Sequence, residues 1–293
     1  MADGVVRGVL PANLKVSLAL VTDTAREARA RHHLERVSAS LLAQGLVGGV
    51  LLASLQKGDS RTNLQLECDG PLKGFFVDAG SEGDCRGYAK NPTLDVELGE
   101  GPFRWRAALG NSGFLSVLRD LGTEYYRSSV ELTAMDVAED LNHYFTLSDQ
   151  VLTKVAIEVR QVGDEPLGLV AGVLVQLLPD GDRQALEELS GRLASGLGLA
   201  LAAQGTQGPG ALFAHLFPGV PPMVEYPVAF RCSCSRERAL KTIASLGKPE
   251  VQHIVDTMGS TAVTCHFCGT KHEVTLIDLL RLLDELGAEP PRS

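Results

Sequence analysis

VSASLLAQGLVGGVLLASL, residues 37–55, contains no charged side chain over nineteen positions. A membrane-spanning helix needs about 20 predominantly apolar residues, so this segment comes close to the length criterion. Its three serines, three glycines and one glutamine favour instead a buried helix that packs closely through its small residues. The start of the chain has an early acidic residue and no basic segment before an unbroken apolar run, which argues against a signal peptide. We therefore expect a cytoplasmic protein with no membrane partner.

The residues on either side of this helix predict a mixture of helices and strands. Residues 22–36 are rich in Ala, Arg, Glu and His, which predicts a helix with Asp23 or Thr24 as its N-cap. After the apolar segment, alternating polarity and turn signals at residues 69–71 and 80–84 predict a short-looped antiparallel meander. Its strands are expected over residues 61–68, 72–77 and 85–89.

The chain up to residue 180 continues in the same way. The predicted elements are strands over 113–118 and 125–132, a helix over 134–144, and a hairpin of strands over 152–162 and 167–178. The run GLVAGVLVQLLP, residues 168–179, is almost continuously apolar, which is typical of a strand inside a sheet. We therefore expect an α+β fold, with a β-rich N-terminal core domain and packed helices over residues 1–180.

Two further regions are expected after the core. Residues 182–201 alternate charged side chains with leucines, which predicts a helix of marginal stability by itself. Residues 205–222 are rich in Gly and Pro, with one short helical piece around 212–216. We expect a helical linker over residues 181–227 and a small zinc-binding domain over residues 228–293.

Four cysteines at the C-terminal end have the spacing of a metal site. They form the pattern Cys232-Ser-Cys234 and, 30 residues later, Cys265-His-Phe-Cys268. Two closely spaced pairs supply four soft ligands, which suits tetrahedral zinc; iron would accept the same set. Gly269 after the second pair fits the tight turn of such a knuckle. The sequence therefore predicts that these four cysteines bind one Zn²⁺.

Three histidines and two further cysteines are not expected to be metal ligands. The nearby histidines are expected to lie outside a coordination shell that four cysteines already fill, as exposed or supporting imidazoles. The two other cysteines lie on predicted strands and are expected to be buried, inert thiols. These residues are His253, His266, His272, Cys68 and Cys85.

Two roles are open for the four-cysteine site. Closed four-ligand zinc sites usually have a structural role, so a structural zinc ribbon that acts as a binding module is one alternative. A redox switch is the other, because each pair holds sulfurs close enough in sequence to become a disulfide, and peroxide attacks thiolates. A domain of about 60 residues has a marginal core without its metal, so oxidation and zinc release are expected to unfold it.

Other classes of function fit the sequence less well. The formal net charge of −9 argues against nucleic acid as a main partner, because phosphate binding needs a clustered positive face. Catalytic zinc keeps an open coordination position, and the chain has neither an HExxH motif nor a GxSxG elbow. A thiol–disulfide oxidoreductase would present a single exposed CxxC at a helix N-terminus. We therefore expect a protein that is not an enzyme.

Several segments along the chain carry a family resemblance. They are DGPLKGFFVDA at 69–79, RGYAKNP at 86–92, AEDLNHY at 138–144 with SDQ at 148–150, AGVLVQLLP at 171–179, CSCSRERA at 232–239, LGKPE at 246–250 and VTCHFCG at 263–269. Together they resemble the 33-kDa chaperonin family of redox-regulated heat-shock holdases, almost from end to end. Asp149 stands where the family usually has Glu, and residues 271–274 replace an aromatic-rich segment. Neither departure is expected to touch a metal ligand, but the second is expected to alter the packing of the zinc domain.

The resemblance implies a mechanism. The reduced, zinc-bound form is inactive. Oxidation joins Cys232 to Cys234 and Cys265 to Cys268, releases zinc, and unfolds the zinc domain and the linker. The exposed apolar surface then binds unfolding client proteins without ATP, and the oxidised form is a homodimer. The leucine-rich linker is the expected source of that surface.

Overall fold

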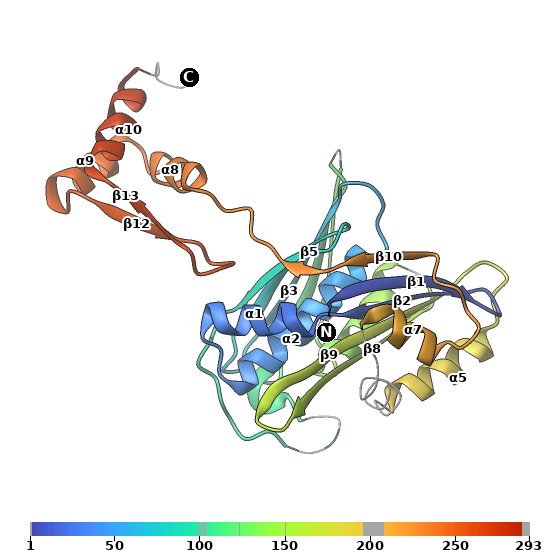
Figure 1. Ribbon diagram of the computed structural model, residues 1–293. Coiled ribbons are helices and arrows are strands. Elements are labelled where there is room, and N and C mark those ends of the chain that lie inside the picture. Colours follow the sequence, from blue (N-terminus) through green and yellow to red (C-terminus); the bar gives the residue numbers. More distant parts are fainter. Residues whose placement is uncertain are drawn as a thin grey trace. The chain divides into compact units, whose positions relative to one another are not determined.

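A computed structural model describes residues 2–99, 101, 104–122, 124–149, 151–195 and 208–288 (Figure 1). The chain divides into two compact units, a large unit of residues 1–231 and a small unit of residues 232–293. Sheets and helices are both present, so the predicted α+β class is confirmed. Each unit is described by itself below.

The first sheet of the large unit has five antiparallel strands, and the chain does not visit them in order. Their spatial order is β10 (Val224–Pro227), β1 (Gly4–Leu10), β2 (Leu14–Leu20), β9 (Glu165–Leu177) and β8 (Thr153–Val162). The predicted hairpin of β8 and β9 is confirmed. The apolar run 168–179 largely coincides with β9, which pairs with β2 on one side and β8 on the other, so its interior position is also confirmed.

The second sheet contains the predicted meander. Its order is β11 (Ala229–Phe230), β5 (Asp84–Ala89), β4 (Gly74–Gly80), β3 (Arg61–Cys68), β6 (Gly113–Asp120) and β7 (Tyr125–Glu131). β4 starts at Gly74 and not at the predicted residue 72. Lys73 adopts a positive φ of 61° and its N–H donates to the Gly70 carbonyl at 3.1 Å, so a turn occupies that position. The pairing of β11 with β5 is parallel.

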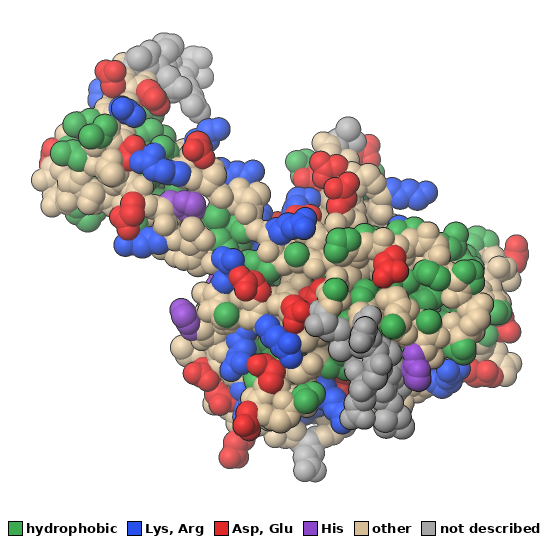
Figure 2. Space-filling view, in the orientation of Figure 1, with side chains coloured by type: hydrophobic (Ala, Val, Ile, Leu, Met, Phe, Trp, Pro, Cys, Tyr) green, Lys and Arg blue, Asp and Glu red, His purple; other side chains and the backbone are tan. Residues whose placement is uncertain are grey.

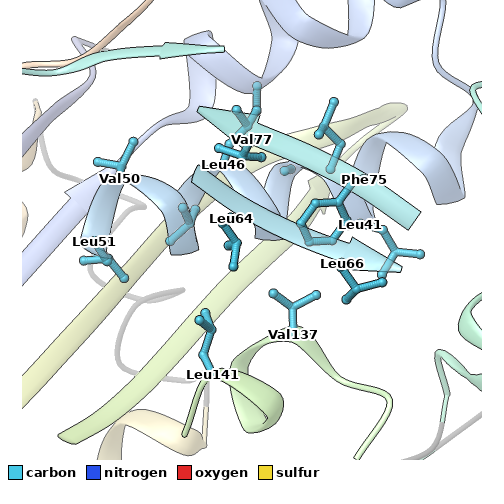
Figure 3. Close-up of a cluster of buried hydrophobic side chains, with 14 of the residues drawn as sticks. Leu41, Leu46, Val50, Leu51, Leu64, Leu66, Phe75, Val77, Val137 and Leu141 are labelled. Carbon is cyan, nitrogen blue, oxygen red and sulfur yellow. The ribbon is translucent and has the colours of Figure 1, made fainter. Parts of the chain in front are cut away.

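Helix α2 (Arg36–Ala53) is the centre of the large unit. It contacts β9, β8 and β2 of the first sheet and β3, β4 and β5 of the second, and so lies between the two sheets (Figure 1). Its apolar side chains meet those of β3, β4 and the neighbouring helix α4 (Val137–Tyr144) (Figure 3). The helix is long and apolar enough to cross a membrane, yet 89% of it is buried inside the protein. The predicted buried helix is confirmed.

Small residues bring α2 close to the second sheet. A methyl group added at Gly45 would lie 2.5 Å from a ring carbon of Phe75, and one added at Gly49 would lie 2.6 Å from a Val77 methyl carbon. Both distances are shorter than van der Waals contact. The glycines therefore allow a helix–sheet distance that larger residues would prevent.

Helix α1 (Thr22–His32) starts at the predicted residue, but its N-cap and its end differ from the prediction. Neither Asp23 nor Thr24 is the N-cap; Val21 holds that position and makes no side-chain cap. Instead, the carboxylate of Asp3 accepts the N–H groups of Asp23 at 3.1 Å and Thr24 at 2.6 Å. The helix ends at His32 because His33 adopts the left-handed conformation with φ 51°.

The predicted helix over 134–144 begins at Val137, three residues later than expected. Asp136 is its N-cap and accepts the N–H groups of Ala138 at 3.0 Å and Glu139 at 3.2 Å. A π-helical turn, Phe145–Asp149, follows, and a short helix, α3 (Arg106–Leu109), precedes β6.

The outer face of the first sheet is covered by the region that was expected to be a linker. Helices α5 (Arg183–Ala194) and α7 (Pro209–Leu216) bury their apolar faces against β1, β2, β8 and β9. β10 belongs to the same region. The described parts of residues 181–227 are therefore part of the large unit and not a separate linker, because their leucines are core residues. The predicted helical positions 196–201, with Leu197 and Leu199, lie outside the described residues.

The small unit contains three helices and one hairpin among its described residues. They are α8 (Arg236–Ala244), α9 (Lys248–Thr257), β12 (Thr261–Thr264), β13 (Lys271–Val274) and α10 (Leu276–Ala288). The small unit begins at Cys232 and not at the predicted residue 228. Val228 is buried in the core of the large unit, and the Arg231 N–H donates to the Cys85 carbonyl at 3.0 Å, so both residues belong to the large unit.

Candidate metal centre

Two separate segments of the small unit supply the four cysteines predicted as ligands. Cys232 and Cys234 lie just before α8, whose N-cap, Ser235, accepts the N–H of Arg238 at 3.3 Å. Cys265 and Cys268 lie in the loop that joins β12 to β13. The strands of this hairpin are in antiparallel register, with Thr264 opposite Lys271 at the end next to the loop.

The loop of the hairpin is a tight knuckle. The Gly269 N–H donates to the Cys265 carbonyl at 2.8 Å, and the Cys265 N–H donates to the Thr270 carbonyl at 2.9 Å. Gly269 has a φ of 71°, a conformation in which a side chain is strained. The expected turn role of Gly269 is confirmed.

The four sulfur atoms lie together, all within 4.8 Å of one another. The distance from Cys232 Sγ to Cys265 Sγ is 3.7 Å, and that from Cys234 Sγ to Cys268 Sγ is 3.4 Å. A tetrahedron with zinc–sulfur bonds of about 2.3 Å has sulfur–sulfur edges of about 3.8 Å. The cluster of Cys232, Cys234, Cys265 and Cys268, called the cysteine cluster below, thus has the size and the donor type of a zinc site.

The thiols of the cysteine cluster differ in acidity. Burial, together with the neighbouring sulfurs of Cys268 and Cys232, raises the pKa of Cys234. Burial also raises the pKa of Cys265. Burial acts in the same direction at Cys268, but hydrogen bonds with the hydroxyl and N–H of Thr270 and with the sulfurs of Cys234 and Cys232 together outweigh it and lower the pKa of Cys268 to about 7. Cys268 therefore ionises before Cys234 and Cys265.

An ion pair and a capping box connect the first cysteine-bearing segment to α10. Arg236, two residues after Cys234, forms an ion pair with Asp278 in the first turn of α10. Asp278 also accepts the N–H of Thr275 at 2.8 Å and its hydroxyl at 2.6 Å. These bonds from Thr275 and Arg236 hold the pKa of the Asp278 carboxyl at about 2. The Cys232 segment is thereby fixed to the helix that follows β13.

Two polar side chains contact the cysteine cluster; His272 was expected to be an exposed or supporting imidazole, and Thr270 was not predicted to have a role. Cys268 Sγ is hydrogen-bonded to the Thr270 hydroxyl at 3.2 Å. The Nε2 atom of His272 lies 3.4 Å from Cys234 Sγ. The expectation that residues 271–274 touch no ligand is therefore wrong. Alternation along β13, in which exposed Lys271 and Glu273 flank half-buried His272, is the sequence signal that would have placed this imidazole on the inner face.

The other peripheral residues lie where they were expected. His253 and His266 are exposed. Cys68 and Cys85 are buried in the large unit, and burial raises the pKa of both thiols, which disfavours the reactive thiolate. Their prediction as buried thiols is confirmed.

The structure defines a class of protein with two parts. The first is a core of two sheets with a central helix, and the second is a small unit that carries a candidate metal centre of four cysteines. The family model described as Hsp33 protein matches residues 3–275. The 33 kDa chaperonin of a Cyanothece species is 34% identical over 99% of both chains, and that of Geobacter sulfurreducens is 34% identical over 94% of this chain and 93% of the relative. The crystal structure of the 33 kDa chaperonin from Thermotoga maritima matches with a TM-score of 0.86 and 25% identity, over 99% of this chain and 100% of the other.

The chain belongs to the Hsp33 family. The resemblance noted from the sequence motifs is thereby confirmed. The relatives carry the names of chaperonins, so family membership supports a chaperone role for this chain.

Proposed function

We propose that this protein is a redox-regulated, ATP-independent holdase that prevents the aggregation of unfolding proteins. The observation that carries the proposal is the cysteine cluster itself, four sulfurs within 4.8 Å in a unit with a very small core. The buried apolar side chains of that core, among the described residues, are Ile243, Val251, Val274, Leu279, Leu282 and Leu283. A core of this size depends on a metal crosslink for its stability.

Cys232, Cys234, Cys265 and Cys268 would hold one zinc ion in the reduced protein. The sulfur distances fit the tetrahedral geometry of zinc, and four thiolates close its coordination shell. Zinc, when bound, crosslinks the segment before α8 to the β12–β13 hairpin and keeps the sulfurs as thiolates. This inactive state is the resting form in the proposal.

Oxidation by a peroxide is the proposed signal. Peroxide converts one cysteine thiolate to a sulfenic acid, with its second oxygen leaving as water, and the neighbouring thiol then displaces a second water to form a disulfide. We propose the pairs Cys232–Cys234 and Cys265–Cys268, as in the resembled family. The sulfurs that lie 3.7 and 3.4 Å apart belong to different segments, Cys232 with Cys265 and Cys234 with Cys268, and would give a competing pairing. Mapping the disulfides by mass spectrometry distinguishes the two pairings.

The apolar surface for clients would come from the cover of the first sheet. In the structure Leu186, Leu189 and Leu193 of α5 and Leu212 and Phe213 of α7 are buried against that sheet. Departure of these helices would expose their apolar faces and the sheet beneath them together. We propose that this surface binds clients in the cytoplasm and that the oxidised protein forms a homodimer.

The visible surface is consistent with protein clients. On the face shown in Figure 2, Lys and Arg side chains alternate with Asp and Glu and do not form a continuous field of one sign. Nucleic-acid binding depends on clustered positive charge. Unfolded proteins are recognised through apolar surface, which needs no net charge of either sign.

An aggregation assay tests the proposal. Thermal aggregation of citrate synthase is followed by light scattering with reduced, zinc-loaded protein and with peroxide-treated protein. We expect protection only after oxidation, and zinc release, measured with a chromogenic chelator, that rises in step with protection. Equal protection by the two forms would exclude a redox switch.

The alternative function is a structural zinc ribbon that acts as a binding module. Four ligands in a closed shell usually stabilise structure, which favours this alternative. Full client protection while zinc stays bound would support it and overturn the switch.

A further inference from the structure

The cysteine cluster has a fifth metal donor beside it. His272 Nε2 lies 3.4 Å from Cys234 Sγ, and the ring is half-buried. His272 shares the inner face of β13 with buried Val274, two residues along the strand. The strand therefore holds the imidazole at the Cys234 corner of the cluster.

Three potential ligands come from one hairpin. Cys265 and Cys268 lie in the knuckle, and His272 is the second residue of β13, paired with Val263 of β12. The bond from the Cys265 N–H to the Thr270 carbonyl connects the two sides of the knuckle. The hairpin thus fixes these three residues relative to one another without help from the Cys232–Cys234 segment.

We infer that Cys232, Cys265, Cys268 and His272 form a second zinc-ligand set, in which His272 replaces Cys234. Three thiolates and one imidazole are a common tetrahedral ligand set for zinc. The replacement requires the ring to move into the volume left by the Cys234 sulfur, a shift no larger than the 3.4 Å between the two atoms. The site then has five donors for four coordination positions.

The second ligand set makes Cys234 the replaceable ligand of the cluster. Loss of Cys234 from the coordination shell leaves a fourth donor in place, and zinc remains bound. In the described part of the chain, the imidazole nitrogen of His272 lies beside the sulfur of Cys234. This inference rests on the metal site of the proposed function and is independent of the redox switch.

The test compares zinc binding by the full chain and its variants under anaerobic, reducing conditions. The variants are Cys234→Ala, Cys232→Ala, His272→Ala, and the double variants Cys234→Ala/His272→Ala and Cys234→Ala/His266→Ala. Zinc per chain is measured by mass spectrometry of the metal after gel filtration, and affinity by competition with a chromogenic chelator. His266 is the matched control, since it is a histidine of the knuckle itself, between Cys265 and Cys268.

We expect Cys234→Ala to retain one zinc per chain and to bind it at least about 10-fold more tightly than Cys234→Ala/His272→Ala. Cys234→Ala/His266→Ala should bind like Cys234→Ala. His272→Ala with all four cysteines present should keep its zinc. Cys232→Ala should lose affinity more strongly than Cys234→Ala.

Cobalt provides a second readout that does not depend on chaperone activity. Cobalt-loaded Cys234→Ala should keep tetrahedral d–d absorption, while its sulfur-to-metal charge-transfer absorption falls by about one quarter, because three of four thiolates remain. If Cys234→Ala binds no metal, or binds it as weakly as the double variant with His272→Ala, the second ligand set does not exist. Failure of the unsubstituted chain to bind zinc would instead overturn the proposed metal site itself.

Discussion

Asp3 precedes β1 by one residue and is 8% exposed. Its carboxylate accepts two N–H groups from the first turn of α1, twenty residues further along the chain. These bonds favour the charged form, but burial outweighs them and raises the pKa of Asp3. A buried carboxylate thus fixes the start of α1 at a cost in stability that depends on pH.

The Asp3→Asn variant should reveal this pH dependence. A raised pKa means that the folded state binds the proton more strongly than the unfolded state, so the cost is present above the folded pKa and disappears as the pH falls toward 3.8. The amide of the variant does not titrate in this range. The free energy of unfolding of the natural protein should therefore rise relative to that of Asp3→Asn as the pH is lowered from 7 to 4.

Urea unfolding of both proteins at several pH values measures this difference. Any constant offset from the lost carboxylate hydrogen bonds cancels, since only the change with pH is compared. A difference that is constant, or that moves the opposite way, would contradict the assignment of burial as the dominant effect.

The sequence predicts the roles of some residues and not of others. The four cysteines of the cluster were predicted to lie together because ligand spacing within each pair is a local property, and the structure brings them within 4.8 Å. His272 was placed outside the coordination shell by counting ligands, as an exposed or supporting imidazole, and strand alternation indicates that it points toward the cluster. Asp3 was missed as a cap because no local pattern shows that β1 begins beside α1.

At the scale of elements, α2 illustrates a helix whose composition is set by its neighbours. Its interior glycines reduce helix propensity by about 1 kcal/mol each relative to alanine. In return, Gly45 allows the ring of Phe75, and Gly49 allows Val77, to approach the helix axis. Packing against two sheets, and not helix propensity, decides the conformation of this segment.

Two glycine-to-alanine variants separate packing from propensity. Gly45→Ala should destabilise the protein, because overpacking costs about 1–3 kcal/mol and exceeds the gain of about 1 kcal/mol in propensity. Gly191→Ala is the matched control, since a methyl group on this residue of α5 would meet nothing within 4 Å. It should stabilise the protein by about 0.5–1 kcal/mol.

Denaturant midpoints at constant slope measure both changes. Stabilisation by Gly45→Ala would show that the helix and Phe75 separate easily, which the close packing between the two sheets argues against. Destabilisation by Gly191→Ala would show that α5 is held by contacts other than those of its apolar face.

Most elements between α1 and α7 were predicted, some with shifted ends, whereas β1, β2 and the helices and strands of the small unit were not predicted. Strong periodicity identified β3, β6, β7, β8 and β9, and the described elements confirm them. The start of β4 was missed because the turn at Lys73 depends on a positive φ that its sequence does not require. The role of α5 and α7 was missed because the apolar outer face of the first sheet, which they cover, follows only from the strand order.

At the scale of the whole molecule, the two units differ greatly in the size of the apolar core that stabilises them. The large unit contains two extensive clusters of buried apolar side chains, on either face of the first sheet. The small unit has one cluster of six such side chains among its described residues. A domain with so small a core usually needs a metal or disulfides to remain folded.

Metal removal should therefore unfold one unit and leave the other folded. After treatment of the reduced protein with a strong zinc chelator, amide exchange should rise throughout the described part of the small unit, residues 232–288. Protection in β2, β3 and β9 of the large unit should not change. Hydrogen exchange with peptide-level mass spectrometry measures both. Retained protection in β12 and β13 without metal would show that the small core is sufficient by itself.

The position of β10 late in the chain determines when the first sheet can fold during synthesis. β1 leaves the ribosome among the first residues, yet its outer partner, β10, is complete only at Pro227. Cys265 follows 38 residues later, which at about 5–20 residues per second takes about 2–8 s. Strand pairing occurs within about microseconds to seconds. The nascent chain can therefore complete its first sheet before the second pair of cysteines emerges from the ribosome, and translation itself separates folding of the core from assembly of the cysteine cluster.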